Sequence, residues 1–284
     1  VAVCVALVVT ALAGTGGFCW WLFHRTPGQY FDSKGVPIYY TDEGQGEPVI
    51  LVHGVAANAD LNWRRPGVTR LLAKEFRVIT FDLRGHGRSG KPDRPEDYGP
   101  ELYEDIVRLM DHLHIEKAHV AGYSLGGFLT LKLAATHPER LKSVAICSAG
   151  WADPATNPEI PNPYAKPKLA SRTVYLNASA APRGLFGGIV HYVRNKIGDM
   201  ILPDKVKKAL KTSYAALAVE QSALDAIQVP TLCIIGTSDG FLPWARTLKA
   251  HLHDVEYVEI PGADHLWTPT KSAFQKTLLD FLEK

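Results

Sequence analysis

The stretch Gly122-Tyr123-Ser124-Leu125-Gly126 decides how the rest of this sequence is interpreted, because it matches the pattern G-x-S-x-G. The apolar run 118–121 before it predicts a buried strand, and the apolar run 126–135 after it predicts a helix. In such a strand–turn–helix the tight turn exposes the serine hydroxyl, and the small flanking residues let neighbouring chains approach. The helix N-terminus also directs backbone N–H groups toward the serine. We therefore predict that Ser124 is a catalytic nucleophile.

Composition places the chain among ordinary globular proteins. It has 284 residues, of which 46% are hydrophobic and 21% charged, and its formal net charge is +2. That length suffices for one large α/β domain with a substantial core. The near-neutral charge, and the lack of a basic run with interleaved aromatics, argue against a nucleic-acid partner.

The four cysteines form neither a metal motif nor a redox motif. No C-x-x-C occurs, and no Cys/His cluster has ligand spacing, so we predict no metal and no cofactor. Cys147 and Cys233 lie within predicted strands, where we expect small buried side chains. Because those strands are candidates for neighbours in the sheet, a disulfide between them is the alternative.

The N-terminus carries a second strong signal. Residues 1–23 contain no charged side chain, and His24-Arg25 follow them. One interpretation is an uncleaved membrane anchor, with Trp20 and Trp21 at the lipid–water interface. The other is a signal peptide cleaved after Ala11-Leu12-Ala13, which would leave a secreted or periplasmic enzyme. We favour the anchor, because cleavage there would expose the apolar residues 18–23. The sequence predicts no oligomeric state.

Strand and helix patterns alternate along most of the chain. The predicted strands are 30–32, 36–41, 48–52, 77–81, 118–121, 143–147, 231–236 and 255–260. The predicted helices are 61–75, 101–113, 126–135 and two that begin near Pro243 and Pro269. Repeated βα units of this kind predict a doubly wound, mostly parallel sheet with helices on both faces.

The alternation is interrupted between about residues 151 and 224. Residues 153–167 carry five prolines, and helical stretches follow without an intervening strand. Basic residues outnumber acidic ones in this segment, which we interpret as a solvated face rather than a ligand site. We expect the chain to comprise an N-terminal segment, 1–25, and one domain, 26–284, that contains this insertion.

A serine hydroxyl needs a base to remove its proton, and that base is usually a histidine held by a carboxylate. Asp239 directly follows the strand 231–236, and His265 follows the strand 255–260. The carboxyl ends of parallel strands meet at one edge of a sheet, so we expect both side chains to reach Ser124. His251 and His253 precede the last strand, at its wrong end, and Asp153 is the fallback acid.

Acyl chemistry also requires donors for the tetrahedral oxyanion. The backbone N–H of Leu125 is the first candidate, because Leu125 starts the helix after Ser124. The second is the N–H of Val55, in the loop that leaves the strand 48–52. We expect His53, at the start of that loop, to order it rather than to act as a base.

From Tyr30 to Lys284 the chain resembles α/β-hydrolase-fold enzymes with a serine nucleophile. The matching motifs are His53-Gly54, the run Asp82-Leu83-Arg84-Gly85-His86-Gly87-Arg88-Ser89, the glycine-rich turn 122–127, Asp239 and His265. The resemblance implies a small helical lid over the region 151–224. It also implies that the loop 84–89 is structural support, so His86 is given no catalytic role. Relatives that cleave epoxides or carbon–halogen bonds use aspartate as the nucleophile, which Ser124 argues against.

Three functions compete. The first is hydrolysis of a carboxylic ester or related acyl bond, in a small-molecule substrate, through an acyl-Ser124 intermediate. The second is a carbon–carbon bond hydrolase that uses the same three residues. The third is a ligand-binding protein without turnover, which an intact serine, acid, base and oxyanion loop disfavour.

Overall fold

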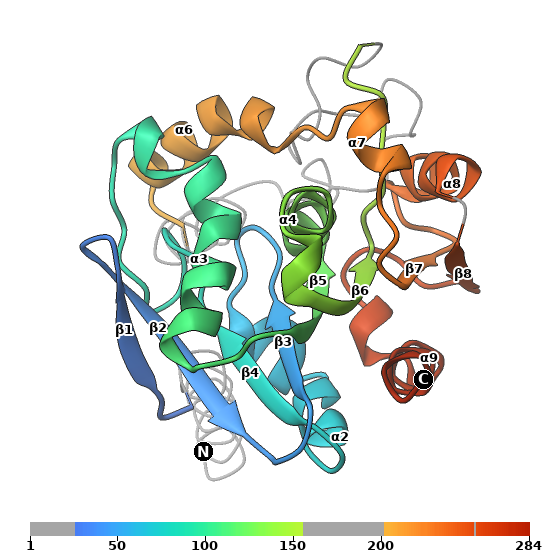
Figure 1. Ribbon diagram of the computed structural model, residues 1–284, viewed down its shortest axis with the longest axis horizontal. Helices are drawn as coiled ribbons and strands as arrows, with labels where there is room; N and C mark the ends of the chain where they lie inside the picture. The colour runs from blue at the N-terminus through green and yellow to red at the C-terminus, as the bar shows by residue number, and fades with distance from the viewer. Residues whose placement is uncertain (1–25, 156–201, 253) are drawn as a thin grey trace, which may run out of the picture.

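The computed structural model of the chain describes residues 26–155, 202–252 and 254–284. Within these residues one sheet has eight strands in the order β1-β2-β4-β3-β5-β6-β7-β8. The strands are β1 (Gln29–Ser33), β2 (Val36–Glu43), β3 (Pro48–Val52), β4 (Arg77–Phe81), β5 (Ala118–Tyr123), β6 (Leu141–Cys147), β7 (Thr231–Gly236) and β8 (Val255–Ile260). Figure 1 shows β3 and β5 near the centre of this sheet.

Strand direction creates the edge at which a site would form. β2 runs antiparallel to both β1 and β4, whereas all the pairings from β4 through β3 to β8 are parallel. The chain moves from β3 outward to β4 and then returns to place β5 on the other side of β3. The loops after β3 and β5 therefore diverge at a topological switch point, where ligands bind in open α/β sheets. The predicted fold, an α/β-hydrolase sheet that is mostly parallel, is confirmed.

Helices connect the strands and cover both faces. The α-helices of the described residues are α2 (Val68–Leu72), α3 (Pro100–His112), α4 (Leu125–Thr136), α6 (Asp204–Ser213), α7 (Gln221–Asp225), α8 (Leu242–His251) and α9 (Ser272–Leu282). Shorter elements are the π-helix η1 (Asp60–Arg64) and the 3₁₀ turns η2 (Pro95–Asp97), η3 (Pro138–Arg140), η5 (Tyr214–Leu217) and η6 (Thr268–Thr270).

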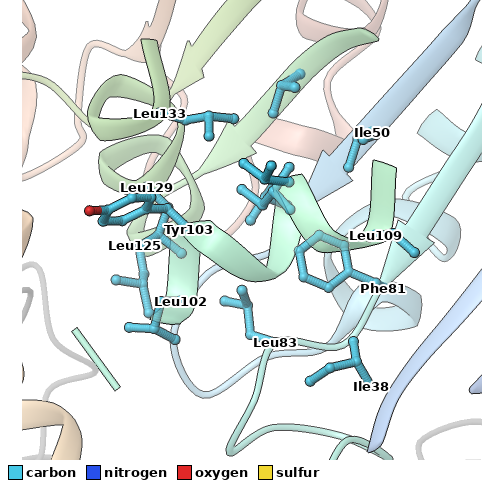
Figure 2. Packing of buried hydrophobic residues seen from close by; sticks show 14 of the residues in the cluster. Ile38, Ile50, Phe81, Leu83, Leu102, Tyr103, Leu109, Leu125, Leu129 and Leu133 are labelled. Carbon is cyan, nitrogen blue, oxygen red and sulfur yellow. The ribbon is translucent and has the colours of Figure 1, made fainter. Parts of the chain in front are cut away.

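The two faces of the sheet belong to different hydrophobic clusters, as side-chain alternation along a strand requires. In β3, Ile50 and Val52 pack with residues of α3 and α4, and Figure 2 shows Ile50 within this cluster. The intervening Val49 and Leu51 pack with residues of α2 and α9. In Figure 1, α4 and α9 accordingly lie on opposite sides of the sheet.

The continuous helix predicted over 61–75 is wrong. The structure instead has the π-helix η1 followed, after a turn, by the short helix α2. Pro66 cannot donate the backbone hydrogen bond that a helix interior needs, and Gly67 has a φ of 95°, outside the helical region. The apolar residues of the segment keep a helical spacing across this break. The hydrophobic pattern alone therefore did not reveal where the helix is interrupted.

The expectation of a membrane-anchored protein is corrected. Across 26–155, 202–252 and 254–284, no helix combines the length and apolar character needed to cross a bilayer. The longest described helix, α3, has 13 residues, which is about 20 Å at 1.5 Å per residue. A bilayer core is about 30 Å thick. Residues 1–25, on which the anchor and signal interpretations rested, lie outside the described residues.

Cys147 and Cys233 are free and buried, as expected for small core side chains. β6 and β7 are neighbours, but Cys147 packs in the cluster with α9, whereas Cys233 packs in the cluster on the other face, with α8. A disulfide between Cys147 and Cys233 would have to pass through the sheet, so the alternative of a disulfide between these strands is excluded. The lid predicted for 151–224 stays a prediction, because its residues 156–201 lie outside the described ranges.

Candidate active site

Ser124 occupies a strained turn between β5 and α4. Its φ is 54° and its ψ is −116°, a backbone combination that residues other than glycine rarely adopt. The turn is tight because glycines flank it. A Cβ atom on Gly122 would lie 2.0 Å from the Gly126 carbonyl oxygen, and one on Gly126 would lie 2.2 Å from the Val52 carbonyl oxygen. The pattern G-x-S-x-G therefore reflects close backbone contact on both sides of the serine.

His265 reaches Ser124 from the carboxyl end of β8, and Asp239 reaches His265 from the carboxyl end of β7. His265 Nε2 lies 2.9 Å from the Ser124 Oγ. On the other side of the ring, Nδ1 lies 2.9 Å from Asp239 Oδ2 and 3.1 Å from Oδ1. Because a carboxylate only accepts hydrogen bonds, this contact selects the tautomer with hydrogen on Nδ1 and leaves Nε2 to accept from the serine. The Asp239 side chain is fully buried, and that of His265 is 21% exposed.

Asp239 is itself oriented by the backbone around it. Its Oδ1 accepts the Phe241 N–H at 2.9 Å, and its own N–H donates to the Gly236 carbonyl at 3.0 Å. The Phe241 ring then packs edge-on against the His265 ring, with 5.2 Å between centroids. The carboxylate and imidazole are thus held in one geometry by neighbours that do not titrate.

Tyr123 also supports His265, a role that the sequence did not reveal. Its hydroxyl donates to the His265 carbonyl oxygen at 2.7 Å, and its ring centroid lies 5.6 Å from that of His265. Burial, and secondarily the Asp239 charge, hold the pKa of Tyr123 well above its usual range, so the hydroxyl keeps its proton. Its place as the second residue of G-x-S-x-G was the only signal, and that position tolerates many residue types.

The loop after β3 approaches Ser124 closely. A Cβ atom on Gly54 would lie 3.1 Å from the Ser124 Cβ. His53 orders this loop, as expected, because its Nδ1 lies 2.7 Å from the Gly54 carbonyl oxygen and its Nε2 accepts the Leu83 N–H at 2.9 Å. Val55 is half-buried. The close approach of Gly54 to Ser124 shows that the two predicted oxyanion donors, Val55 and Leu125, belong to adjoining segments.

The loop 82–90 acts as a support for the loop after β3. The Asp82 carboxylate accepts the Ala59 N–H at 2.9 Å and the Arg88 N–H at 2.8 Å, which joins the two loops. His86 is fully buried, and its ring packs edge-on against His53 at 5.3 Å. Burial lowers the pKa of His86 to about 3, so the side chain is neutral near pH 7. These contacts agree with the structural role that the sequence motif implied for this loop.

Among the described residues, the other acid and base candidates from the sequence make no contact with Ser124 or His265. Asp153 accepts the Ala155 N–H at 2.9 Å, and Asp239 occupies the position next to His265. The Nδ1 of His251 lies 2.9 Å from the Thr247 carbonyl oxygen, and its ring packs against Trp151. His253 lies outside the described residues. Within the described ranges, no group of three or more His, Cys, Asp or Glu side chains is arranged to hold a metal ion.

Comparison with known proteins supports one family. A family model described as the alpha/beta hydrolase fold matches residues 47–183. A dihydrolipoyllysine-residue acetyltransferase component of an acetoin cleaving system, from Pseudomonas putida, is 30% identical over 78% of this chain. That match spans only 59% of the relative's own length.

Two other proteins match along nearly their whole length. A 2-hydroxymuconate semialdehyde hydrolase from Pseudomonas sp. strain CF600 is 29% identical over 90% of this chain and 93% of its own. The solved structure of an enol-lactonase from Burkholderia xenovorans LB400 is 27% identical, with a TM-score of 0.67, over 90% of this chain and 100% of its own. With the sheet order and the turn at Ser124, these matches show that the chain belongs to the α/β-hydrolase superfamily.

Proposed function

We propose that the chain is a serine hydrolase that cleaves a carboxylic ester or a related acyl bond in a small-molecule substrate. The observation that carries the proposal is the unbroken chain of contacts from Ser124 Oγ through the His265 ring to the Asp239 carboxylate, with heavy-atom distances of 2.9 Å at both steps. A base within this distance is what a serine needs to become nucleophilic at neutral pH.

In the proposed reaction Ser124 Oγ attacks the substrate carbonyl while His265 Nε2 takes the hydroxyl proton. Asp239 keeps the ring oriented and stabilises the imidazolium without accepting the proton. The N–H groups of Val55 and Leu125 bind the oxyanion of the tetrahedral intermediate. His265 then returns the proton to the leaving alcohol, which produces the acyl-enzyme. Water, activated by the same imidazole, attacks the acyl carbon and releases the acid.

A lactone is a cyclic ester, so the likeness to an enol-lactonase favours an ester-type bond. The likeness to 2-hydroxymuconate semialdehyde hydrolase favours the second candidate function, hydrolysis of a carbon–carbon bond. Both candidates use Ser124 and His265, so the residues of the site do not separate them, and a substrate comparison does.

The test compares p-nitrophenyl esters of several chain lengths, an enol lactone and a vinylogous diketone as substrates for one enzyme preparation. We expect ester or lactone turnover to exceed carbon–carbon cleavage. We also expect Ser124→Ala to lower kcat by about 10⁴-fold or more while leaving the fold intact. Faster cleavage of the diketone would establish the second candidate. Turnover in Ser124→Ala above a tenth of the wild-type rate would refute the nucleophile assignment.

A further inference from the structure

The loop after β3, which approaches Ser124, is hydrogen-bonded to a π-helix, a rare type of secondary structure. Asn62 lies in the π-helix η1, and its Oδ1 accepts the Gly54 N–H at 2.9 Å. The donor identifies the atom, because only the carbonyl oxygen of an amide side chain accepts a hydrogen bond from an N–H. Asn62 is 8% exposed, so this bond is shielded from water. Single π-turns are uncommon and occur frequently at functional sites.

The bond to Asn62 completes the restraint of Gly54. The Gly54 N–H is held by Asn62, and its carbonyl oxygen is held by His53 Nδ1 at 2.7 Å. The peptide groups before and after Gly54 are therefore both fixed. In a planar trans peptide the N–H points away from the carbonyl. Fixing the Gly54 carbonyl toward His53 thus directs the N–H of Val55 the opposite way.

Hydrogen bonds at the end of the loop fix the π-helix η1, and they therefore also fix the position of Asn62. The Asn62 N–H donates to the Asn58 carbonyl at 3.0 Å, and the Leu61 N–H donates to Asn58 Oδ1 at 3.0 Å. Arg65 N–H closes the wide turn onto the Asp60 carbonyl at 2.8 Å. The loop and η1 consequently form a closed unit whose inner contact is the bond from Gly54 to Asn62.

We propose that Asn62 is a positioning residue, which holds Gly54 so that the Val55 N–H stays directed at the oxyanion formed on Ser124. The inference rests on the proposed function, since it assigns Asn62 to the oxyanion loop of that reaction. It also explains why Val55, rather than Gly54, supplies the second donor, because the Gly54 N–H is already bonded to Asn62. Removing an oxyanion donor costs about 10²- to 10³-fold in kcat. Loosening one through Asn62 should cost less, about 10- to 100-fold.

The test compares wild type, Asn62→Ala and the control Thr80→Val. Thr80 is 1% exposed and shares a 2.8 Å hydroxyl contact with Thr41 on neighbouring strands, so the control also loses a buried hydrogen bond. Each variant is assayed for kcat and KM with a p-nitrophenyl ester and for amide hydrogen exchange at Gly54. Inhibition by a trifluoromethyl ketone, which mimics the tetrahedral intermediate, is measured alongside.

We expect Asn62→Ala to speed Gly54 exchange by about tenfold or more, because its amide loses a buried acceptor. We also expect kcat to fall with KM within about threefold of wild type, and inhibitor affinity to weaken in proportion to kcat. Thr80→Val should change neither kcat nor Gly54 exchange. A kcat within about threefold of wild type in Asn62→Ala would overturn the inference, as would equal losses in both variants. A wild-type protein without ester turnover would refute the proposed function instead, since Gly54 exchange is measured without substrate.

Discussion

Replacing Asp105 with alanine should strip a buried arginine of its counter-ion. Asp105 lies on α3 with a fully buried carboxylate, and Arg84, in the loop 82–90, is 2% exposed. Arg84 donates to both carboxylate oxygens at 2.7 Å, and Arg108 adds a third bond at 2.9 Å. The Ser33 hydroxyl also donates to Asp105. The Asp105 carboxylate thus joins α3 to the loop 82–90, which supports the loop after β3 beside Ser124.

The burial of this ion pair determines how much Asp105→Ala should lower the free energy of unfolding. Removing one partner of a buried ion pair costs roughly 3–5 kcal/mol, because the remaining charge is left without compensation. Glu101 lies 3.9 Å from Arg84 and offsets part of the loss. We therefore expect about 3 kcal/mol, a large share of the 5–15 kcal/mol that stabilises a typical domain. At about 2–4 °C per kcal/mol, Tm should fall by roughly 6–12 °C.

Urea unfolding followed by circular dichroism measures the loss, and Arg94→Ala is the matched control. Arg94 pairs with Asp97 at 2.8 Å but is 66% exposed, so its loss should leave the free energy of unfolding almost unchanged. A loss of stability in Asp105→Ala no larger than in the Arg94→Ala control would refute the view that this buried pair holds the loop.

Three further predictions concern the site and its surroundings. Gly126→Ala should abolish soluble expression or sharply lower Tm, because its Cβ would lie 2.2 Å from the Val52 carbonyl oxygen; a Tm near wild type would contradict the close approach. Tyr123→Phe should lower kcat about three- to tenfold with little change in Tm, since the bond to the His265 carbonyl is lost while the packed ring is kept; an unchanged kcat would remove this support role. Burial lowers the pKa of His86 from 6.5 to about 3, so over that pH range the unfolded chain binds a proton that the folded chain does not. Stability should therefore fall as pH drops, by at most about 1.4 kcal/mol per unit from this group, and urea titrations of His86→Gln should show a shallower slope.

Much of the sheet was predictable from local pattern. The boundaries of β3, β4, β7 and β8 coincide with the predicted strands. The first three are short, mostly apolar runs that the structure buries, whereas β8 combines valine, tyrosine and isoleucine with glutamate and is mostly half-buried. The order of Ser124, Asp239 and His265 also followed from topology, since parallel strands deliver their carboxyl ends to one edge. The structure brings these side chains within hydrogen-bonding distance, and their catalytic roles remain predictions.

The supporting contacts were not predictable, because they depend on tertiary geometry rather than on period or spacing. The Tyr123 hydroxyl meets a backbone carbonyl 142 residues away. Asn62 acts from a π-helix, an element with no periodic signature, in a segment where one continuous α-helix was expected. The pairing of Arg84 with Asp105 joins a glycine-rich loop to a helix whose amphipathic pattern only predicted that it would pack.

Covalent trapping at Ser124 tests the central claim most directly. A p-nitrophenyl ester is mixed with the protein, the reaction is quenched with acid during the first turnover, and peptides are sequenced by mass spectrometry. The proposed mechanism predicts one acyl group, located on Ser124, that is absent in Ser124→Ala and strongly reduced in His265→Ala. Turnover of the ester by the wild-type protein with an acyl group on another residue, or with equal acylation of Ser124 in His265→Ala, would contradict it.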